Sequence, residues 1–183
     1  MCLLITCMDY RLSEEVLRRV RPGDLVIRTA GANVRGVARS LAGLPVQEVL
    51  YLPHTDCAAL KLVYSALSQG QPADPQVEEA LVSQYRGRRP ADLEELERLH
   101  VETQVAILRT LFPHARITVE TIDVSKIRWP PRKPIYHLLK PQSRYTQDMI
   151  GAYIIQAFKI EDVKADIKIA EFLGLSLSLN ELV

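Results

Sequence analysis

An apolar run near the start of the chain ends in three residue types that a protein core does not favour. Cys7, Asp9 and Arg11 follow residues 2–6 at alternate positions, so in an extended chain their side chains point in one direction. A thiolate can bind a metal ion, and a carboxylate can accept a proton or act as a further ligand. A guanidinium holds a carboxylate through two parallel hydrogen bonds, which suits Arg11 to orient Asp9.

A second group of chemically active residues follows another apolar run, residues 46–52. His54 and Cys57 stand three positions apart, and Asp56 between them is typical of a turn or of a residue that caps a helix. The carboxyl ends of parallel strands form the crevice in which such sheets bind ligands. If the two apolar runs are neighbouring strands, Cys7, His54 and Cys57 meet at one point.

Two thiolates and an imidazole are ligand types that zinc prefers. Cys7, His54 and Cys57 would leave the fourth position of a tetrahedral ion open to water, as in catalytic zinc sites. Asp9 would either fill that position and close the site or turn away to pair with Arg11. A lone cysteine or histidine is more often structural, and it is the combination of the two clusters that favours a metal.

Composition and charge exclude several broad classes of protein. The chain has 183 residues, of which 48% are hydrophobic and 25% charged, and its net charge is +1. These values are ordinary for one globular domain and give no basic footprint for nucleic acid. No apolar run reaches the about 20 residues of a membrane span, and the apolar start lacks the basic leader of a secretory signal. Three cysteines cannot all pair, so we expect a cytoplasmic protein without a disulfide framework, in which Cys2 is simply buried.

The order of elements places both clusters on an α/β fold. Short apolar runs alternate with helical patterns in the first two thirds of the chain, which predicts a central, mostly parallel sheet flanked by helices. The predicted strands are residues 2–6, 24–30, 46–52 and 115–124, and the predicted helices are residues 13–20, 33–43, 57–70, 75–85 and 91–112.

The chain changes character after residue 124. Residues 128–141 contain four prolines, which indicates an extended surface connector. Two amphipathic segments follow, at roughly 144–158 and 161–173, and they predict a helical C-terminal extension. We therefore divide the chain into a zinc-binding α/β catalytic domain, residues 1–124, and a Pro-rich connector with a helical tail, residues 125–183. The tail is expected to pack on the same domain or on a partner subunit.

The sequence around both clusters resembles that of the β-class carbonic anhydrases. CMDYRL resembles the Cys-x-Asp-x-Arg element of that family, and PHTDCAA resembles its Gly-His-Thr-Asp-Cys-Gly element. VIRTAGANV and LHVETQVAILRTLFPHARITVETIDV resemble two further segments of the family. The order and spacing of these segments are kept over roughly residues 2–124, and the tail lies outside the resemblance.

The resemblance implies zinc held by Cys7, His54 and Cys57, with Asp9 and Arg11 as a gating pair and Asp9 as the fourth ligand in a closed state. It implies a zinc lyase that hydrates carbon dioxide reversibly to bicarbonate through zinc-bound hydroxide, because zinc lowers the pKa of bound water to ~7. It also implies a homodimer or a higher homo-oligomer. The expected partner is this small substrate, and neither a nucleic acid nor a membrane.

The chain departs from the family pattern at positions beside the motifs. Tyr10 stands where the family has Ser, Thr29 where it has Asn, and Ala32 where another Asn is common. Pro53 and Ala58 replace two glycines. The added bulk of Tyr10 and Ala58 would narrow the channel, reshape it for another small heterocumulene, or obstruct it.

Two alternatives to carbon dioxide hydration therefore stay open. The first keeps the zinc and the fold but hydrolyses carbonyl sulfide or carbon disulfide. The second belongs to another class, a non-catalytic, zinc-stabilised homologue that serves as a binding or assembly module. That module predicts the loss of Asp9 or Arg11, and both residues are present.

The remaining titratable residues are predicted to lie away from the zinc. No spacing brings His100, His114 or His137 to the site, so each is expected at the surface or at a helix end. Arg28 and Arg35 flank a glycine turn. They would either attract bicarbonate or belong to a solvated basic face.

Overall fold

The computed structural model describes all of residues 1–183 and contains one seven-stranded sheet. The four strands predicted from the sequence lie in the order β4-β3-β1-β2 and are mutually parallel. The first and third strands are neighbours, as the proposed convergence of the two clusters requires. The bounds of these strands are β1 (Cys2–Cys7), β2 (Leu25–Thr29), β3 (Glu48–Leu52) and β4 (Arg116–Val119).

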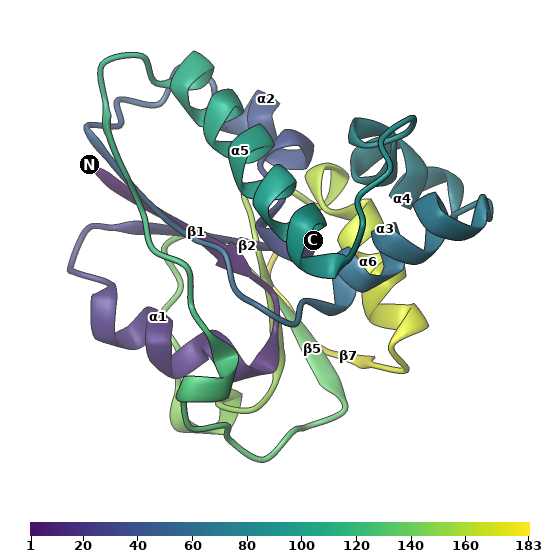
Figure 1. The fold of residues 1–183 in the computed structure, drawn as a ribbon. Helices are drawn as coiled ribbons and strands as arrows, with labels where there is room; N and C mark the ends of the chain where they lie inside the picture. Colours follow the sequence, from purple (N-terminus) through teal and green to yellow (C-terminus); the bar gives the residue numbers. More distant parts are fainter.

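Helices cover both faces of this sheet, which explains why the central strands are continuous apolar runs. In Figure 1, α1 lies on one side of the sheet, and α2 and α5 lie on the other. The chain therefore leaves the neighbouring strands β1 and β3 toward opposite faces, and such a divergence creates a crevice at the carboxyl ends of the two strands. The helices are α1 (Ser13–Arg19), α2 (Ala38–Leu41), α3 (Ala58–Gln69), α4 (Pro75–Ala80), α5 (Leu93–Leu111) and α6 (Lys164–Phe172).

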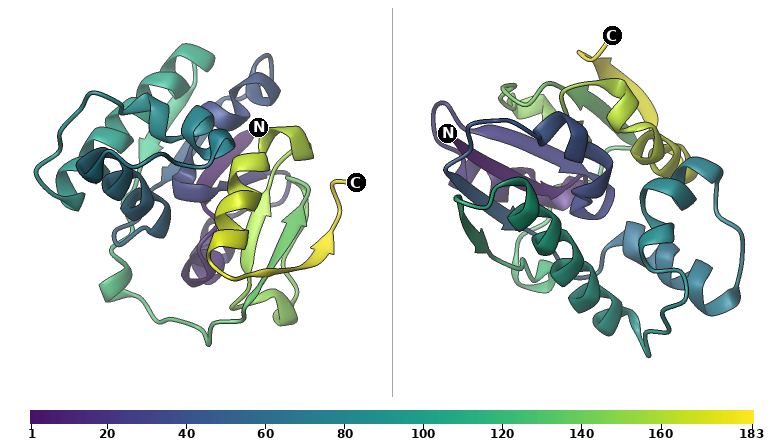
Figure 2. Two further views of the ribbon diagram at one scale, coloured as in Figure 1. Left: turned by 90° about the vertical axis from the view of Figure 1, so that its right-hand side faces the viewer. Right: turned by 90° about the horizontal axis from the view of Figure 1, so that it is seen from above.

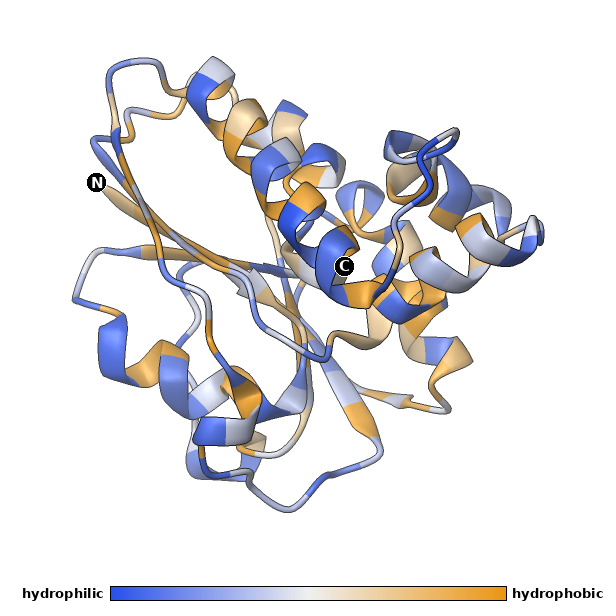
Figure 3. Ribbon diagram, in the orientation of Figure 1, coloured by the Kyte–Doolittle hydropathy of each residue, from blue (hydrophilic) through white to orange (hydrophobic).

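The longest helix, α5, begins where its sequence predicts a cap. The Asp92 side chain accepts a hydrogen bond from the Glu95 backbone N–H at 2.8 Å and satisfies a free donor of the first turn. One side of α5 is hydrophobic and the other hydrophilic (Figure 3). Two polar residues nevertheless occur on its buried side, His100 and Gln104, and both contact the loop beside the candidate site.

The predicted secondary structure of the tail is partly wrong. Residues 125–183 contribute three strands to the same sheet: β5 (Ile135–Leu139), β6 (Tyr153–Gln156) and β7 (Ser176–Asn180). β5 lies inside the segment predicted to be a surface connector, and its last four residues are buried. β6 lies inside the first segment predicted to be helical. Only α6 agrees with the predicted second amphipathic segment.

The sheet therefore continues across residue 124, where the sequence suggested a boundary. Its full order is β4-β3-β1-β2-β6-β5-β7, and β6 is antiparallel to β2 but parallel to β5. The sheet thus consists of two groups of parallel strands, β4-β3-β1-β2 and β6-β5-β7, which meet at one antiparallel seam, the pairing of β2 with β6. The predicted α/β fold, with a mostly parallel sheet flanked by helices, is confirmed.

The tail packs back toward the middle of the chain. α6 lies beside α4, as both views in Figure 2 show. None of the helices has the length and apolar character that a bilayer-spanning helix needs.

Candidate metal centre

The two sequence clusters meet at the carboxyl ends of β1 and β3. Cys7 is the last residue of β1, His54 follows β3, and Cys57 immediately precedes α3. The sulfur atoms of the two cysteines and a ring nitrogen of His54 all lie within 4.8 Å of one another. All three residues are buried. The structure therefore brings together the three residues that the sequence selected as ligands.

The His54 ring is oriented as a metal ligand. Its Nδ1 lies 2.6 Å from the Thr55 backbone carbonyl oxygen, so Nδ1 carries the hydrogen and donates it. The other nitrogen, Nε2, is buried and has no hydrogen-bond partner. A buried nitrogen with a free lone pair is costly unless it binds something, and a metal ion between the two sulfurs would satisfy it. The donor set therefore fits zinc.

The Cys7 sulfur accepts a hydrogen bond from the Gly31 backbone N–H at 3.3 Å. Burial opposes ionisation of the Cys7 thiol, but hydrogen bonding from Cys57 acts against it and lowers the pKa of Cys7. Gly31 has a φ of +73°, and a Cβ there would lie 3.9 Å from the Cys57 sulfur. The contact with sulfur would be ordinary, so it is the positive φ of this turn that favours glycine.

Asp9 is held by Arg11 beside the three ligands. The Arg11 side chain donates from Nε to Asp9 Oδ1 at 3.0 Å and from Nη2 to Asp9 Oδ2 at 2.7 Å. Burial favours the neutral acid, but the hydrogen bonds and the charge of Arg11 lower the pKa of Asp9 below its usual value. Asp9 Oδ2 lies 3.9 Å from His54 Nε2. The carboxylate is therefore next to the ligand cluster while it remains bound to arginine.

Arg11 is itself fixed by two further groups. Its Nη1 donates to Asp56 Oδ2 at 3.1 Å, and its guanidinium lies 4.8 Å from the centre of the Trp129 ring. Asp56 also pairs with Lys61 at 2.5 Å. It lies in a turn, as predicted, but it does not cap α3, because the residue at the N-cap position is Cys57. These contacts pre-orient the guanidinium that holds Asp9.

Arg28 has a role that the sequence did not indicate. Its side chain is fully buried, so it neither belongs to a solvated face nor waits for bicarbonate. It donates from Nε to the Cys7 carbonyl at 2.9 Å and from Nη2 to the Asp9 carbonyl at 2.7 Å. Arg28 therefore shapes the loop that carries both residues. Arg35 is exposed, and its side chain donates only to the Ser83 hydroxyl.

The prediction for His100 is also wrong. It is buried in α5, and its Nε2 donates to the Gly31 carbonyl at 2.7 Å while Nδ1 accepts from the Tyr85 hydroxyl. Burial lowers the pKa of His100 to about 4, so the ring is neutral. Its hydrogen bond to the carbonyl stabilises the Gly31 turn. Gln104, one helical turn later, accepts from the Val34 N–H at 2.7 Å. Periodicity alone could have found these residues, because both interrupt the apolar side of α5.

The other minor predictions have mixed outcomes. His114 is exposed, as expected for a surface residue, whereas His137 is buried in β5 with both ring nitrogens unpartnered. Cys2 is only partly buried, and it does not belong to the cluster of Cys7, His54 and Cys57.

Residues that depart from the family pattern are accommodated locally. The Tyr10 ring packs on Tyr153 of β6, with ring centres 5.4 Å apart. The Thr29 hydroxyl donates to the Asn33 carbonyl at 3.1 Å, and the Pro53 carbonyl accepts from a backbone N–H of the segment after β4. None of the three fills the ligand cluster.

Two cavities adjoin the cluster of Cys7, His54 and Cys57. A small cavity of about 20 Å³ is lined by Cys7 and Asp9 and otherwise almost entirely by apolar residues. A larger pocket of about 370 Å³ is lined by His54 and Cys57 together with charged residues of α5. The candidate centre lies between them.

Comparison with known proteins agrees with the sequence motifs. The profile of the carbonic anhydrase family matches residues 2–127. Similar solved structures include a carbonic anhydrase from Glaciozyma antarctica, which is 22% identical, with 68% of this chain and 77% of that chain covered and a TM-score of 0.42.

Two fungal structures are comparably distant. A tetrameric β-carbonic anhydrase from Sordaria macrospora is 18% identical, with 68% of this chain and 76% of that chain covered and a TM-score of 0.49. The β-carbonic anhydrase CafA from Aspergillus fumigatus is 19% identical, with coverages of 68% and 71% and a TM-score of 0.47. No curated protein sequence matches this chain closely enough to count as a relative.

Proposed function

This chain belongs to the β-class carbonic anhydrase family, whose profile covers residues 2–127, and on that premise we propose that it is a zinc enzyme that hydrates carbon dioxide reversibly to bicarbonate. One observation carries the proposal: the ligand atoms of Cys7, His54 and Cys57 lie within 4.8 Å of one another, buried, on two neighbouring strand ends. Zinc bound there would activate a water molecule as a Lewis acid and lower its pKa to ~7.

Each proposed ligand has support from its own surroundings. Cys7 would bind as a thiolate that also accepts the Gly31 N–H, and Cys57 would bind at the N-terminal end of α3, where the helix dipole favours an anion. His54 would bind through Nε2, because Nδ1 is committed to the Thr55 carbonyl. Outer hydrogen bonds of this kind orient ligands and raise their affinity for metal.

We propose that Asp9 orients the attacking water by accepting a hydrogen bond from it. Its lowered pKa keeps it ionised, and Arg11 leaves it close to the ligand cluster. Its two oxygens are already held by Arg11, so ligation of the metal by Asp9 would require those hydrogen bonds to break. This favours Asp9 as a hydrogen-bond acceptor over Asp9 as a fourth ligand.

The small cavity beside Cys7 and Asp9 suits an uncharged substrate. Eight of its nine lining residues are hydrophobic, and an apolar lining favours a neutral gas over an ion. Carbonyl sulfide is a neutral, linear molecule of the same shape, so this lining also supports it as a second candidate substrate.

Assembly and location are further proposals. We propose a homodimer or a higher homo-oligomer, which is supported by the exposure of a large apolar side chain near the site, Trp129 at 49%. A cytoplasmic location stays a prediction from the sequence.

Zinc content and carbon dioxide hydration, measured on one purified sample, test the proposal. We expect about one zinc per chain and hydration that a chelator abolishes. A sulfide-release assay on the same sample separates the two candidate substrates. A chain that holds zinc but turns over neither substrate would favour the non-catalytic module.

A further inference from the structure

One side of α6 faces the candidate centre. Asp166, Ile169 and Leu173 follow one another at spacings of three and four residues, which places them on one side of a helix. Asp166 is buried, and its Oδ1 accepts a hydrogen bond from the Ala30 backbone N–H at 2.5 Å. Ala30 immediately precedes the glycine whose N–H contacts the Cys7 sulfur. This bond fixes how α6 is rotated relative to the centre.

Ile169 and Leu173 form part of the wall of the small cavity at the centre, together with Tyr153 of β6. We call this the inner cavity; Cys7 and Asp9 line its other side. Its volume is about 20 Å³, and a single water molecule needs roughly 10–15 Å³ on the same measure. The inner cavity therefore has room for one very small molecule.

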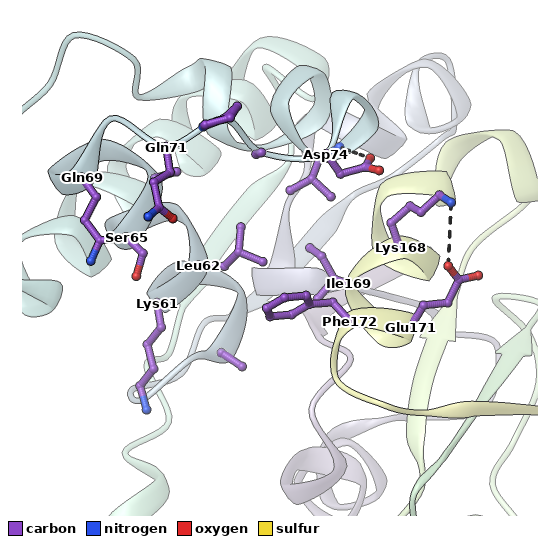
Figure 4. A pocket seen from close by; sticks show the side chains of 15 residues that line it. Lys61, Leu62, Ser65, Gln69, Gln71, Asp74, Lys168, Ile169, Glu171 and Phe172 are labelled. Atoms are coloured by element: carbon purple, nitrogen blue, oxygen red, sulfur yellow. Dashed lines mark hydrogen bonds and ion pairs between the residues drawn. The ribbon is translucent and has the colours of Figure 1, made fainter.

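A much larger groove lies on the other side of Ile169. It has a volume of about 830 Å³ and runs between α3, the segment before α4, and α6 (Figure 4). Leu62, Ile169 and Phe172 face one another across it, while Lys61 and Lys168 lie at its edges. We call this the outer groove. Ile169 and Ala58 line both the outer groove and the inner cavity, so they separate the two spaces.

The alternative approach to the centre is less suited to this chemistry. The pocket beside His54 and Cys57 is lined by three glutamates and one arginine, namely Glu94, Glu97, Glu102 and Arg98. Its net negative charge would repel bicarbonate. In the outer groove, Lys61 and Lys168 are balanced by Asp74 and Glu171, so that groove has no net negative charge, and its floor is apolar.

We propose that Ile169 is a specificity-determining residue, which separates the outer groove from the inner cavity and admits only small linear molecules to Cys7 and Asp9. The inference rests on the proposed function and deepens it, because it assigns the entrance and the size limit for the substrate. It also gives the tail a role in the site.

Xenon binding tests the wall without requiring turnover. Apolar cavities of about 150 Å³ bind xenon, whereas the inner cavity is far smaller. In xenon-pressurised crystals we expect no xenon beside Cys7 in the natural protein and an ordered xenon there in Ile169→Ala. If Ile169→Ala does not fold, Ile169→Val is the substitute, with a weaker xenon peak expected.

The matched control is Ile154→Ala. Ile154 follows Tyr153 in β6 and is fully buried, but it lines neither the inner cavity nor the outer groove. This variant should therefore leave the inner cavity free of xenon. Xenon beside Cys7 in the natural protein, or none there in the folded Ile169 variants, would overturn the inference.

A second measurement tests the size limit on the cobalt-substituted protein. Azide and benzoate are titrated against its visible spectrum, and we expect Ile169→Ala to bind benzoate about 10-fold tighter or more, with azide affinity nearly unchanged. Equal changes for both anions, or no change, would contradict a size-selective wall. Failure of hydration with zinc bound would contradict the proposed function alone, because neither xenon nor anion binding depends on turnover.

Discussion

At the scale of single residues, Arg28 shows how a buried charge can serve backbone geometry. It contacts no carboxylate, and its guanidinium donates to the Cys7 and Asp9 carbonyls and to the Ser13 hydroxyl. Arginine suits this task because its donors point in fixed directions within one plane. The Arg28 side chain thus fixes the loop that carries Cys7 and Asp9.

Replacement of Arg28 should therefore damage both stability and metal binding. For Arg28→Met we expect a loss of about 3 kcal/mol in the free energy of unfolding, because buried carbonyls lose their donors. Zinc affinity should fall by roughly 10-fold or more. Urea denaturation and a chelator competition measure the two effects. Arg35→Met, at an exposed position, should change stability by less than about 0.5 kcal/mol.

The cysteines provide a direct test of ligand assignment. Cys57→Ser should lose most of its zinc and unfold less cooperatively, because a hydroxyl is a much poorer zinc ligand than a thiolate. Metal analysis after gel filtration measures the loss. Cys2→Ser, outside the cluster, should keep its zinc, and full occupancy in Cys57→Ser would refute the assignment.

Asp9 should affect turnover more than metal binding. For Asp9→Ala we expect zinc content to be retained and kcat to fall by about 100-fold, because the attacking water loses the acceptor that orients it. Stopped-flow hydration and zinc analysis on one sample separate the two properties. An unchanged kcat would remove Asp9 from the mechanism.

The cluster of the three proposed ligands could be predicted from the sequence, whereas the residues that support it could not. Cys7, His54 and Cys57 each follow a recognisable strand, so local patterns place them. Arg28 and Asp166 act through contacts with residues up to 136 positions away, and no local pattern reports such contacts.

At the scale of secondary-structure elements, the tail explains most errors. β5 and β6 are only five and four residues long, and β5 lies in a proline-rich run that resembles a linker. Short apolar runs do not separate strand from helix by periodicity. The position of α6 beside the centre likewise follows from packing and not from its own sequence.

The burial of Asp166, which accepts the Ala30 N–H, predicts a pH dependence of stability. Burial raises the pKa of Asp166 from 3.8 to about 7 in the folded protein. The folded state therefore binds this proton more tightly than the unfolded state, so the contribution of Asp166 is greatest below pH 3.8 and is lost as the pH rises to about 7.

Asp166→Asn isolates this contribution, because asparagine keeps an oxygen that can accept the Ala30 N–H. We expect the variant to be more stable than the natural protein at pH 8, by on the order of a few kcal/mol, and the difference to shrink toward pH 4. Urea denaturation across this pH range measures it. A difference that does not vary with pH would show that Asp166 stays charged when buried.

At the scale of the whole molecule, one sheet joins residues 1–124 to the tail. β2 pairs with β6 at Arg28 and Gln156, and the Gln156 side chain accepts from the Tyr145 hydroxyl. The Tyr145 ring in turn lies 5.7 Å from the Arg28 guanidinium. The antiparallel seam is therefore tied directly to the residue that shapes the site.

We accordingly expect the chain to unfold as one unit. Trp129 is the only tryptophan and lies in the tail, so its fluorescence reports on that part while far-UV circular dichroism reports on all helices. The two urea transitions should coincide. Separate midpoints would instead support an independent domain over residues 1–124.

The two tasks of α6 also constrain how this protein can evolve. Asp166 accepts the N–H of the Ala30 turn, which contacts Cys7. Ile169, less than one helical turn later, lines the inner cavity beside Cys7. Insertion of a single amino acid before Asp166 would rotate both by about 100° around the helix axis. Metal retention and substrate choice are thus inherited together, and a lineage that alters one through this helix also alters the other.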